Sequence, residues 1–85
     1  MSIDIEQEIV GAVAHVLKKP AHEIEPHVSF QQLGADELDM FELIIRFEDT
    51  FMLEITDEDA TTLTCVNNVI EYVTRCRNNT NTAAL

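Results

Sequence analysis

The fold is decided by residues 33–53, which read Leu33-Gly34-Ala35-Asp36-Glu37-Leu38-Asp39-Met40-Phe41-Glu42-Leu43-Ile44-Ile45-Arg46-Phe47-Glu48-Asp49-Thr50-Phe51-Met52-Leu53. Gly34 allows a turn, and Asp36 can cap the helix that follows. Asp39, three residues after Asp36, provides something close to a capping box. These signals predict a helix that begins at Glu37.

This predicted helix carries more apolar surface than its packing requires. At ~100° per residue, its apolar side chains cover roughly 220° of the circumference, whereas a stripe of ~100° is enough to bury a helix. The apolar side chains split into two groups, and the first is Met40, Leu43, Ile44, Phe47 and Phe51. The second group, separated from the first by Glu37 and Glu48, is Leu38, Phe41, Ile45 and Met52. One group can serve the core, and the other is available to a ligand or a partner. Ordinary core packing is an alternative for Phe41 and Ile45.

The formal net charge of −11 is concentrated around the same helix. Residues 36–59 hold ten Asp and Glu residues against the single Arg46, which gives −9 and leaves −2 for the rest of the chain. Clustered like charges would steer a basic partner toward this region. They also argue against nucleic acid as a ligand, because its phosphates need Lys and Arg. A solvated acidic face that serves only solubility is the alternative, but such charge would more naturally be spread over the surface.

Periodicity along the rest of the chain predicts a small all-α domain. Eighty-five residues suffice for one domain. The expected elements are a helix over residues 3–18 that ends before Pro20, a loop over 20–35 with one helical turn anchored by Ile24, Val28, Phe30 and Leu33, a helical turn over 57–61 capped by Thr56, and a last helix over 65–77 capped by Thr64. Three long helices, one short helix and a long first loop form an up-and-down bundle with one crossover connection. We expect this domain to occupy residues 1–77 and residues 78–85 to form a flexible C-terminal tail.

Several classes of function are disfavoured by what the sequence lacks. No apolar run approaches the ~20 residues of a membrane span, and no charged-then-apolar leader precedes the first helix. The histidines do not stand at metal-ligand spacing. The sequence shows neither a Ser/His/Asp or Cys/His constellation with supporting context nor a glycine-rich phosphate loop. We therefore expect a cytoplasmic monomer that is not an enzyme and binds no metal.

The run Leu33-Gly34-Ala35-Asp36-x-Leu38-Asp39, followed by Glu42-Leu43, resembles the signature of acyl carrier proteins. The resemblance continues through Phe51, Glu54-Ile55, the turn at 57–60 and residues 66–73, so it covers nearly the whole chain. It implies an acyl-carrier-protein-like four-helix bundle and a place in fatty-acid or polyketide-type metabolism. It also implies a serine between the Asp and the Leu that carries the family's 4′-phosphopantetheine arm, but this chain has Glu37 there.

The resemblance further implies a partner-docking surface on the helix that follows. Its positions in this chain are Asp36, Leu38, Asp39, Phe41, Glu42, Ile45, Glu48 and Asp49. Leu38, Phe41 and Ile45 would form an apolar patch. Glu42, Glu48 and Asp49 would form an acidic rim that meets the basic docking surfaces of acyl-processing or carrier-modifying enzymes. The wide apolar arc and the −9 stretch support this assignment independently.

Glu37 decides how much of the family's chemistry can be carried over. A serine hydroxyl that attacks the pyrophosphate of coenzyme A leaves a stable phosphodiester, whereas a carboxylate would give a mixed anhydride that water destroys. No neighbour substitutes, because the only serines are Ser2 and Ser29, and Ser29 lies in the loop before the signature. We therefore predict that the chain as written carries no cofactor.

Three interpretations remain open. The chain is an acyl-carrier-like docking protein without an arm, whose bundle could hold a non-covalent acyl chain; a pseudo-carrier that regulates or binds outside lipid synthesis; or an engineered Ser-to-Glu form of a working carrier. In the second case Glu37 places a negative charge near the position of the family's phosphate, at a helix N-terminus that favours anions. Glu37 could equally be a good first-turn residue with no role. A mimic of nucleic acid would explain the charge but not the signature residues in register.

Overall fold

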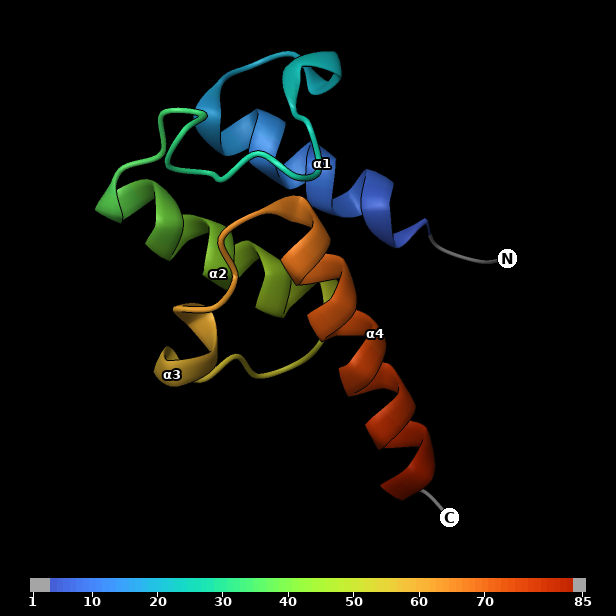
Figure 1. Cartoon of the computed structure of the whole chain (residues 1–85). Coiled ribbons are helices and arrows are strands. Elements are labelled where there is room, and N and C mark those ends of the chain that lie inside the picture. The colour runs from blue at the N-terminus through green and yellow to red at the C-terminus, as the bar shows by residue number, and fades with distance from the viewer. Residues whose placement is uncertain (1–3, 84–85) are drawn as a thin grey trace.

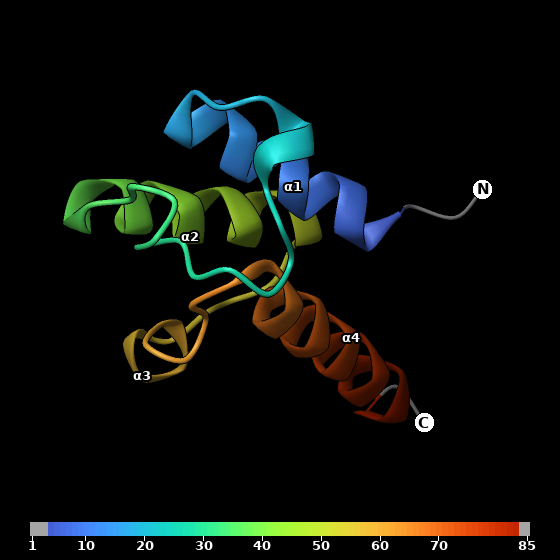
Figure 2. The same cartoon turned by 45° about the horizontal axis from the view of Figure 1, so that its top comes forward.

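The computed structural model describes residues 4–83, with the side chains of residues 4–77. The elements follow in the order α1 (Ile5–Leu17), η1 (Ala21–Glu23), α2 (Glu37–Phe51), α3 (Asp57–Ala60) and α4 (Val66–Ala83). In both views α1 and α3 lie on opposite sides of α2, and α4 runs away from the centre of the domain (Figures 1 and 2). The all-α fold with three long helices, one short helix and a long first loop is confirmed.

α1 is bounded by a cap at each end. The carboxylate of Asp4 accepts the backbone N–H of Gln7 at 3.3 Å, so the helix begins at Ile5 rather than at the predicted residue 3. Lys18 adopts a left-handed conformation with φ of 57°, and its N–H reaches the carbonyl of Ala14. The helix therefore ends at Leu17, and Lys18 is its C-cap instead of part of its last turn.

The long loop between α1 and α2 is packed against the domain, as its apolar anchors predict. Ile24 and Phe30 are buried, and Val28 and Leu33 are half-buried. The N–H of Phe30 donates to the carbonyl of Thr64 at 2.7 Å. The predicted helical turn is η1. The loop is thus hydrogen-bonded to the segment just before α4 and lies beside the start of α2.

The core is built by the apolar faces of the three long helices. α2 contributes Leu43, Phe47 and Phe51, all buried. They pack in one cluster with buried residues of the other elements: Ile9, Val13, Ile24, Phe30, Ala35, Ile55, Leu63, Val66, Val69 and Val73. Met40 and Ile44 are half-buried against this cluster. Of the two apolar groups on α2, the one that contains Met40, Leu43, Ile44, Phe47 and Phe51 therefore faces the core.

The predictions for α3 and α4 were only partly right. Thr56 caps α3 by accepting the N–H of Asp59 at 3.1 Å, as expected. α4 begins at Val66, so Cys65 and not the predicted cap Thr64 directly precedes it, and the hydroxyl of Thr64 donates to the side chain of Asn68 at 2.8 Å. At the other end, α4 passes the predicted end at Arg77 and continues to Ala83. The predicted tail therefore begins inside a helix, its residues 84–85 lie outside the described chain, and its flexibility stays a prediction.

Candidate docking face and attachment position

A complete capping box fixes the start of α2. The carboxylate of Asp36 accepts the N–H of Asp39 at 2.8 Å, and the N–H of Asp36 donates to the carboxylate of Asp39 at 3.1 Å. Gly34, with φ of 102°, makes the turn that leads into the cap. Glu37 is consequently the first helical residue, and its side chain is exposed. The predicted attachment position therefore lies at the exposed N-terminal end of α2.

The second apolar group of α2 faces outward. The exposed fractions are 78% for Leu38, 67% for Phe41, 48% for Ile45 and 86% for Met52. Met52 is the C-cap of the helix, and the other three lie on one side of it. Core packing of Phe41 and Ile45 is thereby excluded as the explanation of their spacing. We call Leu38, Phe41 and Ile45 the apolar strip.

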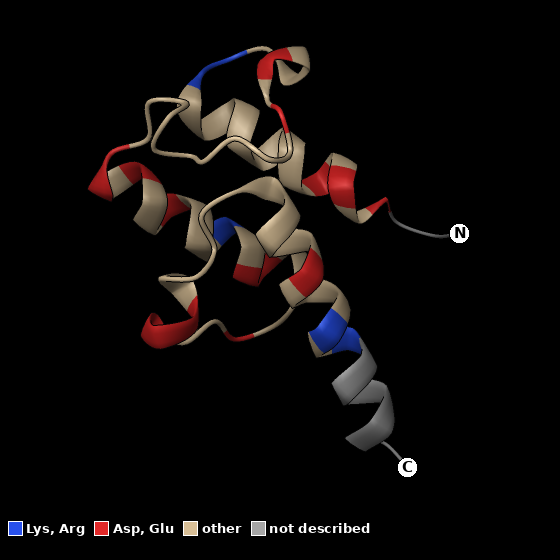
Figure 3. Ribbon diagram, viewed as in Figure 1, with Lys and Arg blue, Asp and Glu red and all other residues tan. Residues whose placement is uncertain are grey.

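Carboxylates border the apolar strip on both edges. With ~100° between successive residues, Glu37 and Glu48 fall on one side of the strip, and Glu42 and Asp49 fall on the other. Acidic residues also cover α3, which lies beside α2 (Figure 3). Six of the eight predicted docking residues thus lie on one face of α2. The other two, Asp36 and Asp39, use their carboxylates in the capping box.

Two of the rim carboxylates have partners within the chain. The Oε2 atom of Glu48 accepts the backbone N–H of Ile55 at 2.8 Å, which fastens the link after α2 to the helix. The Oε2 atom of Glu42 lies 3.5 Å from Nε of Arg46, one helical turn later. The pairing of Glu42 with Arg46 follows from i,i+4 spacing. The bond of Glu48 spans seven residues and leaves no local signal in the sequence.

Two clefts meet beside Glu37. One, with a volume of about 530 Å³, lies between α2 and α3, and its apolar lining includes Met40, Ile44 and Leu63. The other, of about 600 Å³, lies between the long loop and the start of α2, and its lining includes Ser29, Phe30 and Gln31. Glu37, Met40 and Thr64 line both. Sequence reasoning did not find the contributions of Gln31 and Thr64, because loop segments bring them to α2.

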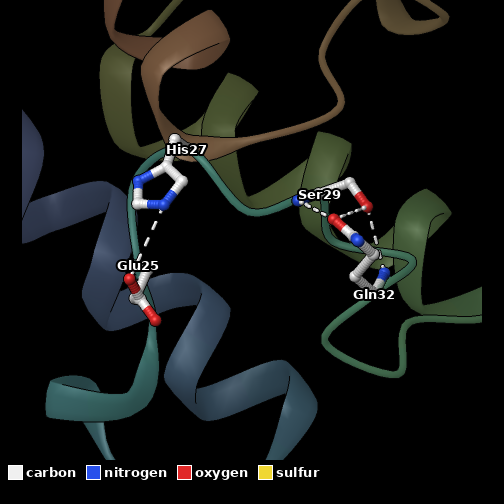
Figure 4. A network of polar contacts seen from close by, with 4 residues as sticks. All are labelled: Glu25, His27, Ser29 and Gln32. Carbon is white, nitrogen blue, oxygen red and sulfur yellow. Dashed lines mark hydrogen bonds and ion pairs between the residues drawn. The ribbon is translucent and has the colours of Figure 1, made fainter.

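Ser29 is the serine closest in sequence to the signature, and its hydroxyl is used in a local turn. Its Oγ donates to Oε1 of Gln32 at 3.2 Å and accepts the N–H of Gln32 at 3.1 Å (Figure 4). In the same loop, His27 lies 3.7 Å from the carboxylate of Glu25. Ser2, the other serine, lies outside the described residues.

Within residues 4–77, whose side chains are described, no three His, Cys, Asp or Glu residues are grouped so that they could hold a metal ion. Among the helices of the described chain, none combines the length and the apolar character needed to cross a membrane.

Comparison with known proteins identifies the family. The family model described as a phosphopantetheine attachment site matches residues 7–73. The acyl carrier protein of Syntrophus aciditrophicus (strain SB) is 39% identical over 70 residues, which cover 81% of this chain and 88% of that protein. The matched region includes the capping box, the apolar strip and its rim. The chain therefore belongs to the acyl carrier protein family, whose members are carrier proteins rather than enzymes.

Proposed function

We propose that this chain is a docking protein of fatty-acid or polyketide-type metabolism that binds acyl-processing or carrier-modifying enzymes without carrying a 4′-phosphopantetheine arm. The single observation behind the proposal is that an exposed apolar strip follows a helix start whose first residue is Glu37, where the resemblance places the attachment serine. We place it in the cytoplasm as a monomer.

The docking half of the proposal is supported by the combination of apolar exposure and charge. A contiguous group of exposed apolar side chains in a small domain marks an interaction site more often than chance exposure does. Here the strip lies between carboxylates and within a stretch that carries −9. A partner with Lys or Arg around an apolar centre would pair with the rim and bury Phe41 and Ile45 at the middle.

The residues at the attachment position do not fit a covalent arm. Glu37 offers a carboxylate, whose phosphoryl derivative would be an anhydride that water cleaves. Ser29 is exposed enough to line the neighbouring cleft, but its hydroxyl is held in the turn with Gln32. Thr50 lies at the far end of α2, one residue before its last residue Phe51.

A free acyl chain remains a ligand that the cleft between α2 and α3 would suit. Its volume of about 530 Å³ and its lining of Met40, Ile44 and Leu63 would shield an apolar chain from water. Such binding would be non-covalent and would use the same opening beside Glu37.

The decisive experiment is an intact-mass measurement after incubation with coenzyme A and a broad-specificity phosphopantetheinyl transferase. We expect no mass gain for the chain as written or for Glu37→Gln, and the gain of one arm for Glu37→Ser. Adding Ile45→Asp to Glu37→Ser should slow this gain, because a charge is placed in the apolar strip. A mass gain on the chain as written would refute the loss of the arm, whereas no gain on Glu37→Ser would refute an intact docking face.

A second candidate is a pseudo-carrier that acts as a regulatory or binding module outside lipid synthesis. It is favoured by the exposed carboxylate of Glu37 at the N-terminus of α2, where a helix stabilises negative charge. Affinity capture with the chain as written and with Glu37→Gln separates the two candidates. Capture of acyl-processing enzymes by both proteins supports the first, and a partner lost with Glu37→Gln supports the second.

A further inference from the structure

The hydroxyl of Tyr72 connects α4 to α3 and to the link that precedes it. It donates to Oδ2 of Asp59, in α3, at 2.9 Å, and it lies 3.4 Å from the carbonyl oxygen of Glu54. These bonds span 13 and 18 residues, whereas the caps of α1, α2 and α3 are local. Tyr72 therefore connects α4 with the segment 54–59, a contact that neither helical periodicity nor local capping predicts.

α3 has little else that fixes its position. It is a helix of four residues, and none of them is buried. A single helical turn is not stable on its own. The buried residues Ile55 and Leu63 flank it and anchor the chain before and after it. Between these anchors, the half-buried Ala60 packs against the core, and the bond from Tyr72 to Asp59 ties the turn to α4.

The position of α3 defines one wall of the cleft between α2 and α3. Asp57, Ala60 and Thr61 line that wall, and residues of α2, including Met40 and Ile44, line the other. A shift of α3 away from α2 would widen the cleft, and a shift toward α2 would close it. The residue that fixes α3 therefore fixes what the cleft admits.

We propose that Tyr72 is a positioning residue for this cleft, and that its bond to Asp59 holds α3 at the distance from α2 that limits entry of an apolar ligand. The inference does not depend on the identity of the docking partner or on the absence of the arm. Burial and then the hydrogen bond to Asp59 raise the pKa of Tyr72 above its ordinary value.

The first test is hydrogen exchange on Tyr72→Phe, which removes the hydroxyl and keeps the ring. The reporters are the amides of Ala60, Thr62 and Leu63, which donate to carbonyls of Thr56, Asp59 and Ala60. If the hydrogen bond has a typical net strength, these amides should exchange about fivefold faster. The amide of Val69, in α4, should keep its rate.

Two further variants make this test specific. Asp59→Ala removes the acceptor and should speed the same α3 amides by a similar factor, with no additional change when it is combined with Tyr72→Phe. Glu58→Ala removes an exposed carboxylate from the same turn and should leave them unchanged. Equal acceleration of exchange at all amides would mean that Tyr72 stabilises the whole domain and does not position α3, which would overturn the proposal. No acceleration, or additive effects of Tyr72→Phe and Asp59→Ala, would overturn the proposal.

The second test is the affinity for N-phenyl-1-naphthylamine, a neutral apolar fluorophore chosen because Glu37, Glu48 and Asp57 line the cleft and would repel an anion. We expect Tyr72→Phe to bind it about fivefold more tightly, because α3 no longer has to break the bond to Asp59. Glu58→Ala should bind it like the parent chain. Faster exchange in α3 without a change in this affinity would show that the bond holds α3 but does not control the cleft.

Discussion

Two phenylalanines of α2 provide the sharpest test of how the helix divides its surface. Phe47 is fully buried, with an exposed fraction of 0%, whereas 67% of Phe41 is exposed. Phe47→Ala leaves a cavity in the core and should cost about 3–5 kcal/mol. A chain of this length has a free energy of unfolding of roughly 4–13 kcal/mol, so this variant should lose a large fraction of its stability.

Phe41→Ala should behave differently, because about a third of the ring is removed from water. Full burial of such a side chain is worth about 1.5–3 kcal/mol, so the lost burial is about 0.5–1 kcal/mol. Alanine has the higher helix propensity and recovers a few tenths, roughly 0.5 kcal/mol at most. The net change should therefore stay within about 0.5 kcal/mol, while arm transfer to Glu37→Ser should slow when Phe41→Ala is added.

Urea unfolding followed by far-UV circular dichroism measures both stabilities under the same conditions. The slope of the unfolding free energy against urea should be similar for the parent and Phe41→Ala, which would establish that the comparison is of stability alone. A loss above about 2 kcal/mol for Phe41→Ala, or equal losses for the two variants, would mean that the strip belongs to the core and would refute the docking face.

Three further predictions concern the turn, the cap and the single tyrosine. Gly34→Ala should lower the unfolding free energy by about 1 kcal/mol or more, because the φ angle of Gly34 is 102°. Gly11→Ala, in α1 with open space around it, should raise the unfolding free energy by roughly 0.5–1 kcal/mol. Urea unfolding measures both changes. Asp36→Ala should cost about 1 kcal/mol in the same assay through loss of the capping box, and an unchanged stability would contradict its role. Tyr72 is the only tyrosine. Because its pKa is raised in the folded state, its tyrosinate absorbance should appear at higher pH in the native protein than in urea. The stability that the protonated phenol contributes should be complete below the unfolded pKa of about 10 and be lost as pH rises through the folded pKa; coincident titrations in the two states would contradict the buried bond.

The start of α2 could be predicted because its determinants are local. Asp36 and Asp39 are three residues apart, and both bonds of the capping box form between them. The division of α2 into a buried and an exposed face was also predictable, since rotation by ~100° per residue depends only on the helix itself. Helical periodicity alone does not tell which of the two faces enters the core. The high exposed fractions of Leu38 and Phe41 show that their face is the outer one.

The errors lie where side chains compete or where a helix has no strong stop. Thr64 is a residue type that often caps helices, but here its hydroxyl donates to Oδ1 of Asn68. The same oxygen lies 3.3 Å from the sulfur of Cys65. Arg77 resembled a helix end because basic residues favour that position. The Asn and Thr residues after it are only weak helix formers, and a helix that is already formed can extend through them, since each added residue contributes a hydrogen bond.

The contacts that the sequence could not reveal are those between distant segments. Glu48 was assigned to the acidic rim from its place on the helix, yet one of its oxygens holds the N–H of Ile55. The bonds of Tyr72 to Asp59 and Glu54 join segments that only the folded chain brings together. Both sets of contacts belong to the link and the short helix after α2, which are too short to have a periodicity of their own.

In this structure, the proposed loss of the arm is physically compatible with the proposed docking. The capping box that orients α2 uses Asp36 and Asp39, and the buried face that anchors it is centred on Phe47. Glu37 takes part in neither, because it is the exposed first residue of the helix, where a carboxylate is favoured by the helix dipole. The apolar strip begins at Leu38 and follows from the orientation of α2 alone. A serine and a glutamate at position 37 should therefore present the same strip to a partner, so the two forms should differ in whether they accept the arm far more than in how tightly they dock.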